Sequence, residues 1–255
     1  MKQVETVADT SRTPILGEAP PLWREPQGLT RMVRVVWMWI ATGVFLVYFK
    51  ILNRAQFEGL EHLPRQGPTL IVCNHISELD GPLVLTAIQC RDPSRFNRTL
   101  TKMEVFKTPI LGSILSSFGC IPINRNGSHI RGMREVLYAM RRGKVVVFPE
   151  GTYSNDGKLL SGPRSLGRLI QWVHPVIIPA VIWGTNIAMP PPSRRVPFGG
   201  EFGVRLGPAL DMAQFYDLPI TRETSRMIVD YLMDVLKSML QDLQDQGRIL
   251  QIENS

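Results

Sequence analysis

His75 and Asp80 are the two residues of this chain whose types and spacing best suit catalysis. They follow residues 69–73, a short apolar run after Gly67 and Pro68 that indicates a buried strand. The pair would therefore lie where a strand gives way to a helix, which is where α/β proteins position their chemistry. A carboxylate five positions from an imidazole can fix one tautomer of the ring, and an oriented imidazole is a general base.

The residues around this pair constrain the reaction that such a base would serve. No neighbour resembles an activated nucleophile, so the proton that His75 removes would belong to a substrate hydroxyl. A hydrolase of acyl esters or thioesters normally needs its own nucleophile, and the sequence has no G-x-S-x-G elbow to provide one. Asp80 also has a simpler interpretation, because Gly81 and Pro82 follow it as they would follow a helix N-cap. The two roles of Asp80 are compatible.

Three more apolar segments end in polar residues or turns. Residues 118–123 lead to Arg125, residues 144–149 lead to the turn 150–153, and residues 176–183 form a long apolar strand with a proline. With these blocks in order, the chain resembles the 1-acylglycerol-3-phosphate acyltransferase family of phospholipid synthesis. That family has an H-x-x-x-x-D motif, an arginine-bearing second motif, an F-P-E-G-T-R-S third motif and a proline-containing fourth strand.

The resemblance implies both a fold and a reaction. The fold would be a single α/β domain, with one mixed β-sheet wrapped by helices. The reaction would move a fatty acyl chain from acyl-coenzyme A or acyl-carrier protein to the free hydroxyl of 1-acylglycerol-3-phosphate, giving phosphatidic acid. His75 would be the general base and Asp80 would orient it. No metal or organic cofactor is expected, because a thioester is already activated and hydrogen-bond donors can stabilise the oxyanion.

The resemblance also assigns substrate-binding residues. Arg125 would clamp the acceptor phosphate with its guanidinium fork. Glu150 would hold a neighbouring cation or a backbone turn, while Gly151 would let the chain approach the acceptor closely. Thr152 would donate a hydrogen bond to the phosphate. Lys102 is a further candidate, with a plain solvated surface cation as the alternative.

Tyr153 departs from the family pattern, which has an arginine at this position. Tyrosine donates one hydrogen bond and brings no charge. Arg125, together with Arg164 or Arg168, could supply the missing charge. A different lysolipid acceptor therefore remains an open alternative, as does a non-catalytic lipid-binding protein on the same fold. A binding protein has no need of an oriented base, so the intact pair His75 and Asp80 argues against the second.

The N-terminal part of the chain differs in composition from the rest. Residues 1–28 are polar and rich in proline, which predicts a flexible tail. Residues 35–49 are uncharged, and as a helix they would extend about 22 Å, short of the roughly 30 Å of a hydrocarbon core. We predict that residues 29–54 are a membrane-anchoring helix that lies in the bilayer or spans it, with a buried core helix as the alternative. Residues 55–255 would form the acyltransferase domain, facing the cytoplasm.

The charge is unevenly distributed along the chain. The formal net charge is +7, and residues 91–144 alone hold 11 Lys and Arg against 3 Asp and Glu. Such a stretch is a solvated basic surface or a surface for anionic lipid, coenzyme A phosphates or an acidic carrier protein. Nucleic acid is not expected as a partner, since few aromatic residues interleave with the basic ones. The three cysteines lack the spacing of metal ligands, so no metal site is predicted.

Apolar runs and helical periodicity alternate after residue 54, which favours an α/β layer architecture. The predicted strands are 69–73, 98–102, 118–123, 144–149, 176–183 and 202–206. The predicted helices are 80–90, 105–117, 129–142, 163–173 and 221–246.

Overall fold

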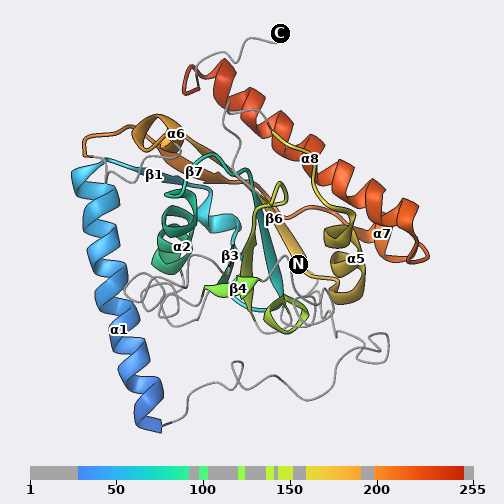
Figure 1. Ribbon diagram of the computed structural model, residues 1–255, viewed down its shortest axis with the longest axis horizontal. Helices are drawn as coiled ribbons and strands as arrows, with labels where there is room; N and C mark the ends of the chain where they lie inside the picture. Colours follow the sequence, from blue (N-terminus) through green and yellow to red (C-terminus); the bar gives the residue numbers. More distant parts are fainter. Residues whose placement is uncertain are drawn as a thin grey trace.

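The computed structural model describes residues 28–91, 98–102, 120–123, 136–140, 143–151, 159–190 and 198–249. Within these ranges the strands form one sheet with the order β1-β7-β6-β2-β5-β3-β4 (Figure 1). The strands are β1 (Gln56–Glu58), β2 (Thr69–Cys73), β3 (Arg98–Lys102), β4 (Ile121–Ile123), β5 (Lys144–Val147), β6 (Val176–Trp183) and β7 (Gly203–Leu206).

Helices precede, connect and follow these strands. The α-helices are α1 (Gly28–Leu46), α2 (Asp80–Arg91), α5 (Arg164–Val173), α6 (Thr185–Ala188), α7 (Ala213–Tyr216) and α8 (Arg222–Asp245). A π-helix, η3 (Val47–Leu52), continues α1, and a short 3-10 helix, η4 (Leu60–His62), follows β1. Residues 136–140 are also helical, within the predicted helix 129–142. The predicted helix 105–117 lies outside the described residues.

The sheet is mixed, as predicted. Strands β6, β2, β5, β3 and β4 run parallel, whereas β7 is antiparallel to β6 and β1 is parallel to β7. Strand β2 lies between β5 and β6, and each of its residues is buried. A central parallel strand is covered on both faces, which explains why it is apolar throughout and does not alternate. The carboxyl end of β2, where His75 follows, is therefore at the middle of the sheet.

Two layers of helices cover the sheet, one on each face. Leu70 and Val72 of β2 belong to the core that packs against α5 and α8. Ile71 and Cys73 belong to the core on the other face, which includes buried residues of α2 and Phe49 of η3. This division follows from the strand period of two residues. The polar loop between β2 and α2 therefore lies at the carboxyl ends of the parallel strands, between the two helical layers.

Several predicted boundaries move by one or two residues, for identifiable reasons. The predicted strand 144–149 ends at Val147, because Pro149 cannot donate to a ladder and Gly151 turns the chain with a φ of 72°. The last helix begins after Thr221, whose hydroxyl accepts a hydrogen bond from the N–H of Thr224 at 3.0 Å. Elements β1, α6 and α7 were not predicted, since three or four residues show no periodicity.

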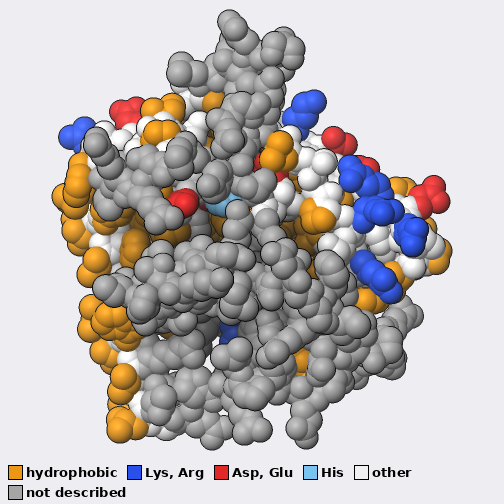
Figure 2. All heavy atoms as spheres, in the orientation of Figure 1, with side chains coloured by type: hydrophobic (Ala, Val, Ile, Leu, Met, Phe, Trp, Pro, Cys, Tyr) orange, Lys and Arg blue, Asp and Glu red, His pale blue; other side chains and the backbone are white. Residues whose placement is uncertain are grey.

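The N-terminal helix leaves much of its apolar surface exposed. The segment Val35–Leu52 is long and apolar enough to cross a membrane, judged by length and composition, and 17% of it is buried. Phe49 enters the core beside α2, whereas Trp37, Trp39 and Val44 are exposed. Figure 2 shows hydrophobic side chains along this edge of the molecule. The alternative of a buried core helix therefore does not hold for most of the segment.

Candidate active site

The structure brings His75 and Asp80 together in the loop that joins β2 to α2. Nδ1 of His75 lies 2.8 Å from Oδ2 of Asp80. Asp80 is the first residue of α2, so the helix itself holds the carboxylate beneath the imidazole. The His75 side chain is 18% exposed and that of Asp80 is 0% exposed. A solute can thus reach the imidazole but not the carboxylate.

The Asp80 carboxylate is held by further donors. Oδ2 accepts the backbone N–H groups of Ile76 at 2.7 Å and Ser77 at 2.8 Å. Oδ1 accepts the hydroxyl of Thr185 at 2.6 Å, from the first residue of α6. A buried carboxylate needs such partners to compensate for the water that it loses. These contacts fix the position of Asp80, and through it the orientation of the His75 ring.

The imidazole is also positioned from its other sides. Its ring stacks on Phe148, with ring centroids 4.2 Å apart and an angle of 20° between the planes. Because the buried carboxylate faces Nδ1, this nitrogen carries the hydrogen in the neutral ring, and Nε2 is the basic nitrogen. An imidazole in this tautomer can accept a proton at Nε2.

Glu150 joins the ends of two neighbouring strands. Its Oε1 accepts the backbone N–H of His75 at 2.8 Å, and its Oε2 accepts that of Leu160 at 2.8 Å. Burial raises the pKa of the Glu150 carboxyl, and the hydrogen bonds from Leu160 and His75 oppose this rise. Glu150 was expected to hold either a neighbouring cation or a backbone turn, and both of these contacts are with backbone N–H groups. The carboxylate thereby fixes the segment that carries the imidazole to the segment that leads into α5.

Two polar side chains fasten the same loop to β6 and to the residues that follow it. The Asn74 side chain donates to the carbonyl of Ile182 at 3.0 Å and accepts its N–H at 2.7 Å, as a neighbouring strand would. The Ser77 hydroxyl donates to the carbonyl of Met189 at 2.9 Å. Both side chains are buried. The loop is therefore held to β6 through side chains where its own backbone has left the sheet.

The other predicted site residues are placed as follows. Gly151 has a φ of 72° and donates its N–H to the carbonyl of Phe148 at 3.0 Å, closing the turn after β5. Lys102 is the last residue of β3, the strand beside β5. Arg125, Thr152 and Tyr153 lie outside the described residues. The structure therefore joins His75, Asp80, Glu150 and Gly151 at the carboxyl ends of β2 and β5.

Sequence reasoning missed two residues of this arrangement. Phe148 belongs to the third sequence block but had no assigned role. Thr185 lies 105 residues from Asp80 in the chain and comes near it because β6 pairs with β2. The signal for Thr185 is its place just after the apolar strand, on a Gly184 turn with a φ of 75°. Among the described residues, no group of three or more His, Cys, Asp and Glu side chains could hold a metal ion.

Comparisons with known proteins give a family and a fold. A family model described as Acyltransferase matches residues 54–183, about half of the chain. The chloroplastic 1-acyl-sn-glycerol-3-phosphate acyltransferase LPAT1 of Arabidopsis thaliana is 28% identical over 163 residues, which cover 62% of this chain and 43% of that protein. Taffazin of Dictyostelium discoideum is 27% identical over 211 residues, covering 74% of each chain.

A solved structure extends the similarity to most of the molecule. The crystal structure of the 1-acyl-sn-glycerophosphate acyltransferase PlsC from Thermotoga maritima superposes with a TM-score of 0.59 and 22% sequence identity. The match covers 83% of this chain and 85% of that one. At this identity the likeness shows the fold. The chain spans less than half the length of the first plant relatives that it matches.

Proposed function

Because the chain belongs to the Acyltransferase family, we propose that it transfers a fatty acyl chain from an acyl thioester to the free hydroxyl of 1-acylglycerol-3-phosphate. The product would be phosphatidic acid, and the donor would be acyl-coenzyme A or acyl-carrier protein. The observation that supports this proposal most directly is the contact of 2.8 Å between His75 and the buried Asp80. Relatives named for this reaction, such as the Arabidopsis protein, support the choice of acceptor.

The proposed chemistry begins with a proton transfer at Nε2 of His75. This nitrogen accepts the proton of the acceptor hydroxyl while the hydroxyl oxygen forms a bond to the thioester carbonyl carbon. The carbon–sulfur bond then breaks, and the departing sulfur takes the proton from His75. The Asp80 carboxylate keeps its contact with Nδ1 and holds the ring in one orientation during both steps. The acyl chain thus passes directly from the donor sulfur to the acceptor oxygen, with no covalent acyl-enzyme.

The remaining site residues would bind and position substrate. Glu150 acts as a positioning residue, since its carboxylate holds the backbone N–H of His75. Gly151 lets the backbone turn beside the acceptor. Arg125 and Thr152 bind the acceptor phosphate, with Lys102 as a further cation. Tyr153 would contact the headgroup without adding charge, which keeps a different lysolipid acceptor as the second candidate.

The proposed acceptor is a membrane lipid, so the enzyme must work at a membrane surface. Exposed apolar side chains on α1 and η3 support attachment there, and Trp37 and Trp39 suit the interface between lipid and water. We propose that the catalytic domain faces the cytoplasm. Neither a metal nor an organic cofactor enters the proposed steps.

A panel assay of the purified full-length protein in detergent tests the proposal. Lysophosphatidate and lysophospholipids with other headgroups would each be offered with acyl-coenzyme A and with acyl-carrier protein. We expect phosphatidic acid from lysophosphatidate, together with release of an equal amount of free thiol. Faster transfer to another lysophospholipid would establish the second candidate. A folded protein that binds lysolipids and transfers no acyl chain would instead be a lipid-binding protein.

A further inference from the structure

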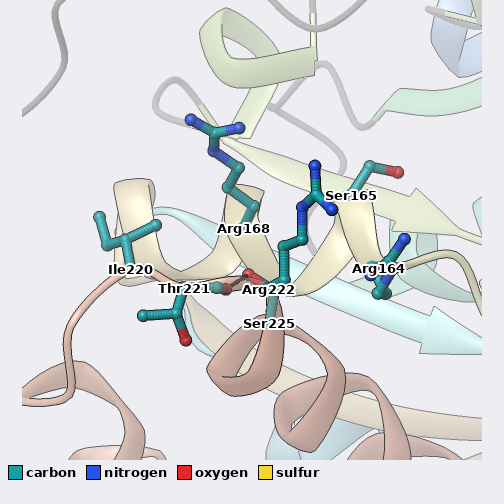
Figure 3. Close-up of a pocket in the computed structure, with 7 residues that line it drawn as sticks. All are labelled: Arg164, Ser165, Arg168, Ile220, Thr221, Arg222 and Ser225. Atoms are coloured by element: carbon teal, nitrogen blue, oxygen red, sulfur yellow. Dashed lines mark hydrogen bonds between the residues drawn. The ribbon is translucent and has the colours of Figure 1, made fainter.

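A cavity of about 390 Å³ lies between the first turns of α5 and α8 (Figure 3). Its lining includes Arg164 and Arg168 from α5 and Arg222 from α8, and no acidic residue. In Figure 3 the Arg168 and Arg222 side chains extend to the same side, each from its own helix. Three positive charges from two distant parts of the sequence therefore share one cavity.

None of these arginines forms an ion pair with a described residue. Other arginines in the described part of the chain do, since Arg205 and Arg226 contact Glu58 and Asp230. Arg168 lies over the Trp172 ring, with the guanidinium carbon 4.6 Å from the ring centroid. Like charges in one cavity repel each other, and a multiply charged anion would relieve that repulsion. Guanidinium groups match phosphate oxygens in shape and charge.

The rest of the lining favours a nucleotide over a simple anion. Ile220 is 44% exposed and offers an apolar surface on which a base can pack. Ser165 lines the cavity as well. The Thr221 hydroxyl is already engaged, because it caps α8 by accepting the N–H of Thr224. A ligand with several phosphates and one flat apolar group would use both kinds of surface.

The position of the cavity favours a ligand that arrives from water. Helices α5 and α8 cover one face of the sheet, whereas η3 and α2 pack on the other. Figure 1 shows α1 and α5 on opposite sides of the molecule. In Figure 2 hydrophobic side chains gather along the α1 side, and Lys and Arg side chains gather over α5 and the start of α8. A bilayer held by α1 would therefore not cover the cavity.

The cavity is also tied to the catalytic loop. Glu150 accepts the N–H groups of both His75 and Leu160. Arg164 comes four positions after Leu160, so their Cα atoms are at most about 14 Å apart. A long flexible ligand could thus occupy the cavity at one end and present a reactive group to His75 at the other.

We infer that this cavity binds the phosphate groups and base of coenzyme A, so that the acyl donor is the coenzyme A thioester. This inference rests on the proposed acyl transfer and names its donor. Arg164, Arg168 and Arg222 bind the phosphates, Ile220 contacts the base, and the flexible arm delivers the thioester to His75. Acyl-carrier protein is the competing donor. Its acidic surface is broad, whereas the arginine site is a concave cavity that fits a small ligand better.

The test compares the full-length protein with the double variant Arg164→Gln/Arg222→Gln. The variant should raise KM for acyl-coenzyme A about ten- to a hundredfold, because it removes charge-assisted bonds to phosphate. Its kcat should stay close to that of wild type. KM for acyl-pantetheine, which lacks the nucleotide, should not change. Lys237→Gln removes one exposed charge from α8 outside the cavity lining and serves as the matched control.

A binding measurement separates this inference from the proposed function. Adenosine 3′,5′-bisphosphate, titrated without any turnover, should bind wild type and Lys237→Gln and should bind the double variant at least tenfold more weakly. Arg164→Lys/Arg222→Lys should recover part of that binding, since it keeps the charge and loses the fork. This result would support the cavity even if acyl transfer were not detected.

Three results would overturn the inference. One is an unchanged KM for acyl-coenzyme A in the double variant. Another is an equal rise in KM for acyl-coenzyme A and for acyl-pantetheine, which would mean that the arginines do not act through the nucleotide. A third is a rise in KM for acyl-carrier protein alone, which would make the cavity part of a docking site for that acidic partner. In each of these cases, acyl transfer by the wild-type protein would still support the proposed function.

Discussion

The two helical layers of this molecule have different outer surfaces. The α1–η3 segment on the α2 side exposes Trp37, Trp39 and Val44. The layer formed by α5 and α8 instead exposes three arginines around a cavity. Both layers bury apolar residues of the same central strands. The hydrophobic effect therefore explains the core of each layer, and the difference between their surfaces must reflect what each one meets.

His75 lies just beyond the carboxyl end of the central strand β2, between these two layers. An insoluble acceptor would approach from the apolar side and a soluble, anionic donor from the arginine side. The loop between β2 and α2 is held by hydrogen bonds of the Asp80, Asn74 and Glu150 side chains. The arginine cavity is open, and its arginines form no ion pairs with described residues. We therefore assign the loop to holding one geometry, and the proposed role of the cavity is to bind the donor. The predictions below test this division, beginning with the largest expected effect.

Replacing His75 by alanine should abolish the step at which the two substrates meet. Loss of a general base typically lowers a rate by about two to four orders of magnitude. Membrane attachment and nucleotide binding should persist, because neither surface includes His75. Initial rates of acyl transfer, measured beside liposome sedimentation, check this. His62→Ala, at an exposed histidine on another part of the molecule, is the control. A His75 variant that retains more than a tenth of wild-type turnover would show that the base is another group.

A charge on the apolar layer should release the protein from membranes. Val44 is 63% exposed and lies near the middle of Val35–Leu52. An aspartate at the centre of a membrane helix costs about 2.5 to 3.5 kcal/mol, so Val44→Asp should weaken liposome binding by as much as roughly a hundredfold. Met227→Asp changes an apolar residue that is 47% exposed on α8, and it should have no such effect. Equal release by both variants would contradict the assignment of lipid to one layer.

Much of this division could be predicted from sequence, because it depends on local patterns. The apolar run 69–73 marked β2, and the spacing of His75 and Asp80 with the family resemblance predicted their contact. The uncharged run 35–49 predicted the membrane anchor. Each of these features lies within one continuous segment, so the order of strands in the sheet was not needed.

The features that were missed depend on which elements become neighbours. Thr185 reaches Asp80 because β6 pairs with β2, and the backbone of His75 reaches Glu150 because β2 pairs with β5. Arg164 and Arg168 were considered for the acceptor phosphate, but Arg222 comes more than fifty residues later. Only the packing of α5 on α8 places it beside them. Strand order and helix pairing depend on contacts between segments far apart in the chain, so local sequence patterns do not reveal them.

Changing Tyr153 to arginine would add a cation in the sequence block that we assign to the acceptor, and it tests which headgroup that block binds. If the acceptor carries a phosphate monoester, the added guanidinium should tighten its binding about ten- to a hundredfold. If Tyr153 selects a less charged lysolipid, the same change should weaken the natural acceptor and favour lysophosphatidate. KM for a panel of lysolipids, at saturating donor, measures this. Equal effects on all acceptors would mean that residue 153 does not face the headgroup.

The smallest expected effect concerns the acid that fastens the catalytic loop. Burial raises the pKa of the Glu150 carboxyl, so the folded protein binds its proton more readily than the unfolded chain. Where the folded state binds more protons, stability falls as pH rises. The contribution of Glu150 should therefore decrease as pH rises through the interval above its ordinary pKa of 4.5, up to the raised pKa.

Glu150→Gln should remove this pH dependence and also weaken the loop. An amide has one oxygen, so it cannot accept both N–H groups, and a buried donor left without a partner costs about 1 to 3 kcal/mol. Melting temperatures of both proteins between pH 4 and pH 7 provide the measurement. The gap between wild type and variant should be widest at the acidic end and should narrow as pH rises. A gap that instead widened with pH would mean that the two backbone hydrogen bonds favour the ionised carboxylate more than burial disfavours it. The loop would then be held by charge.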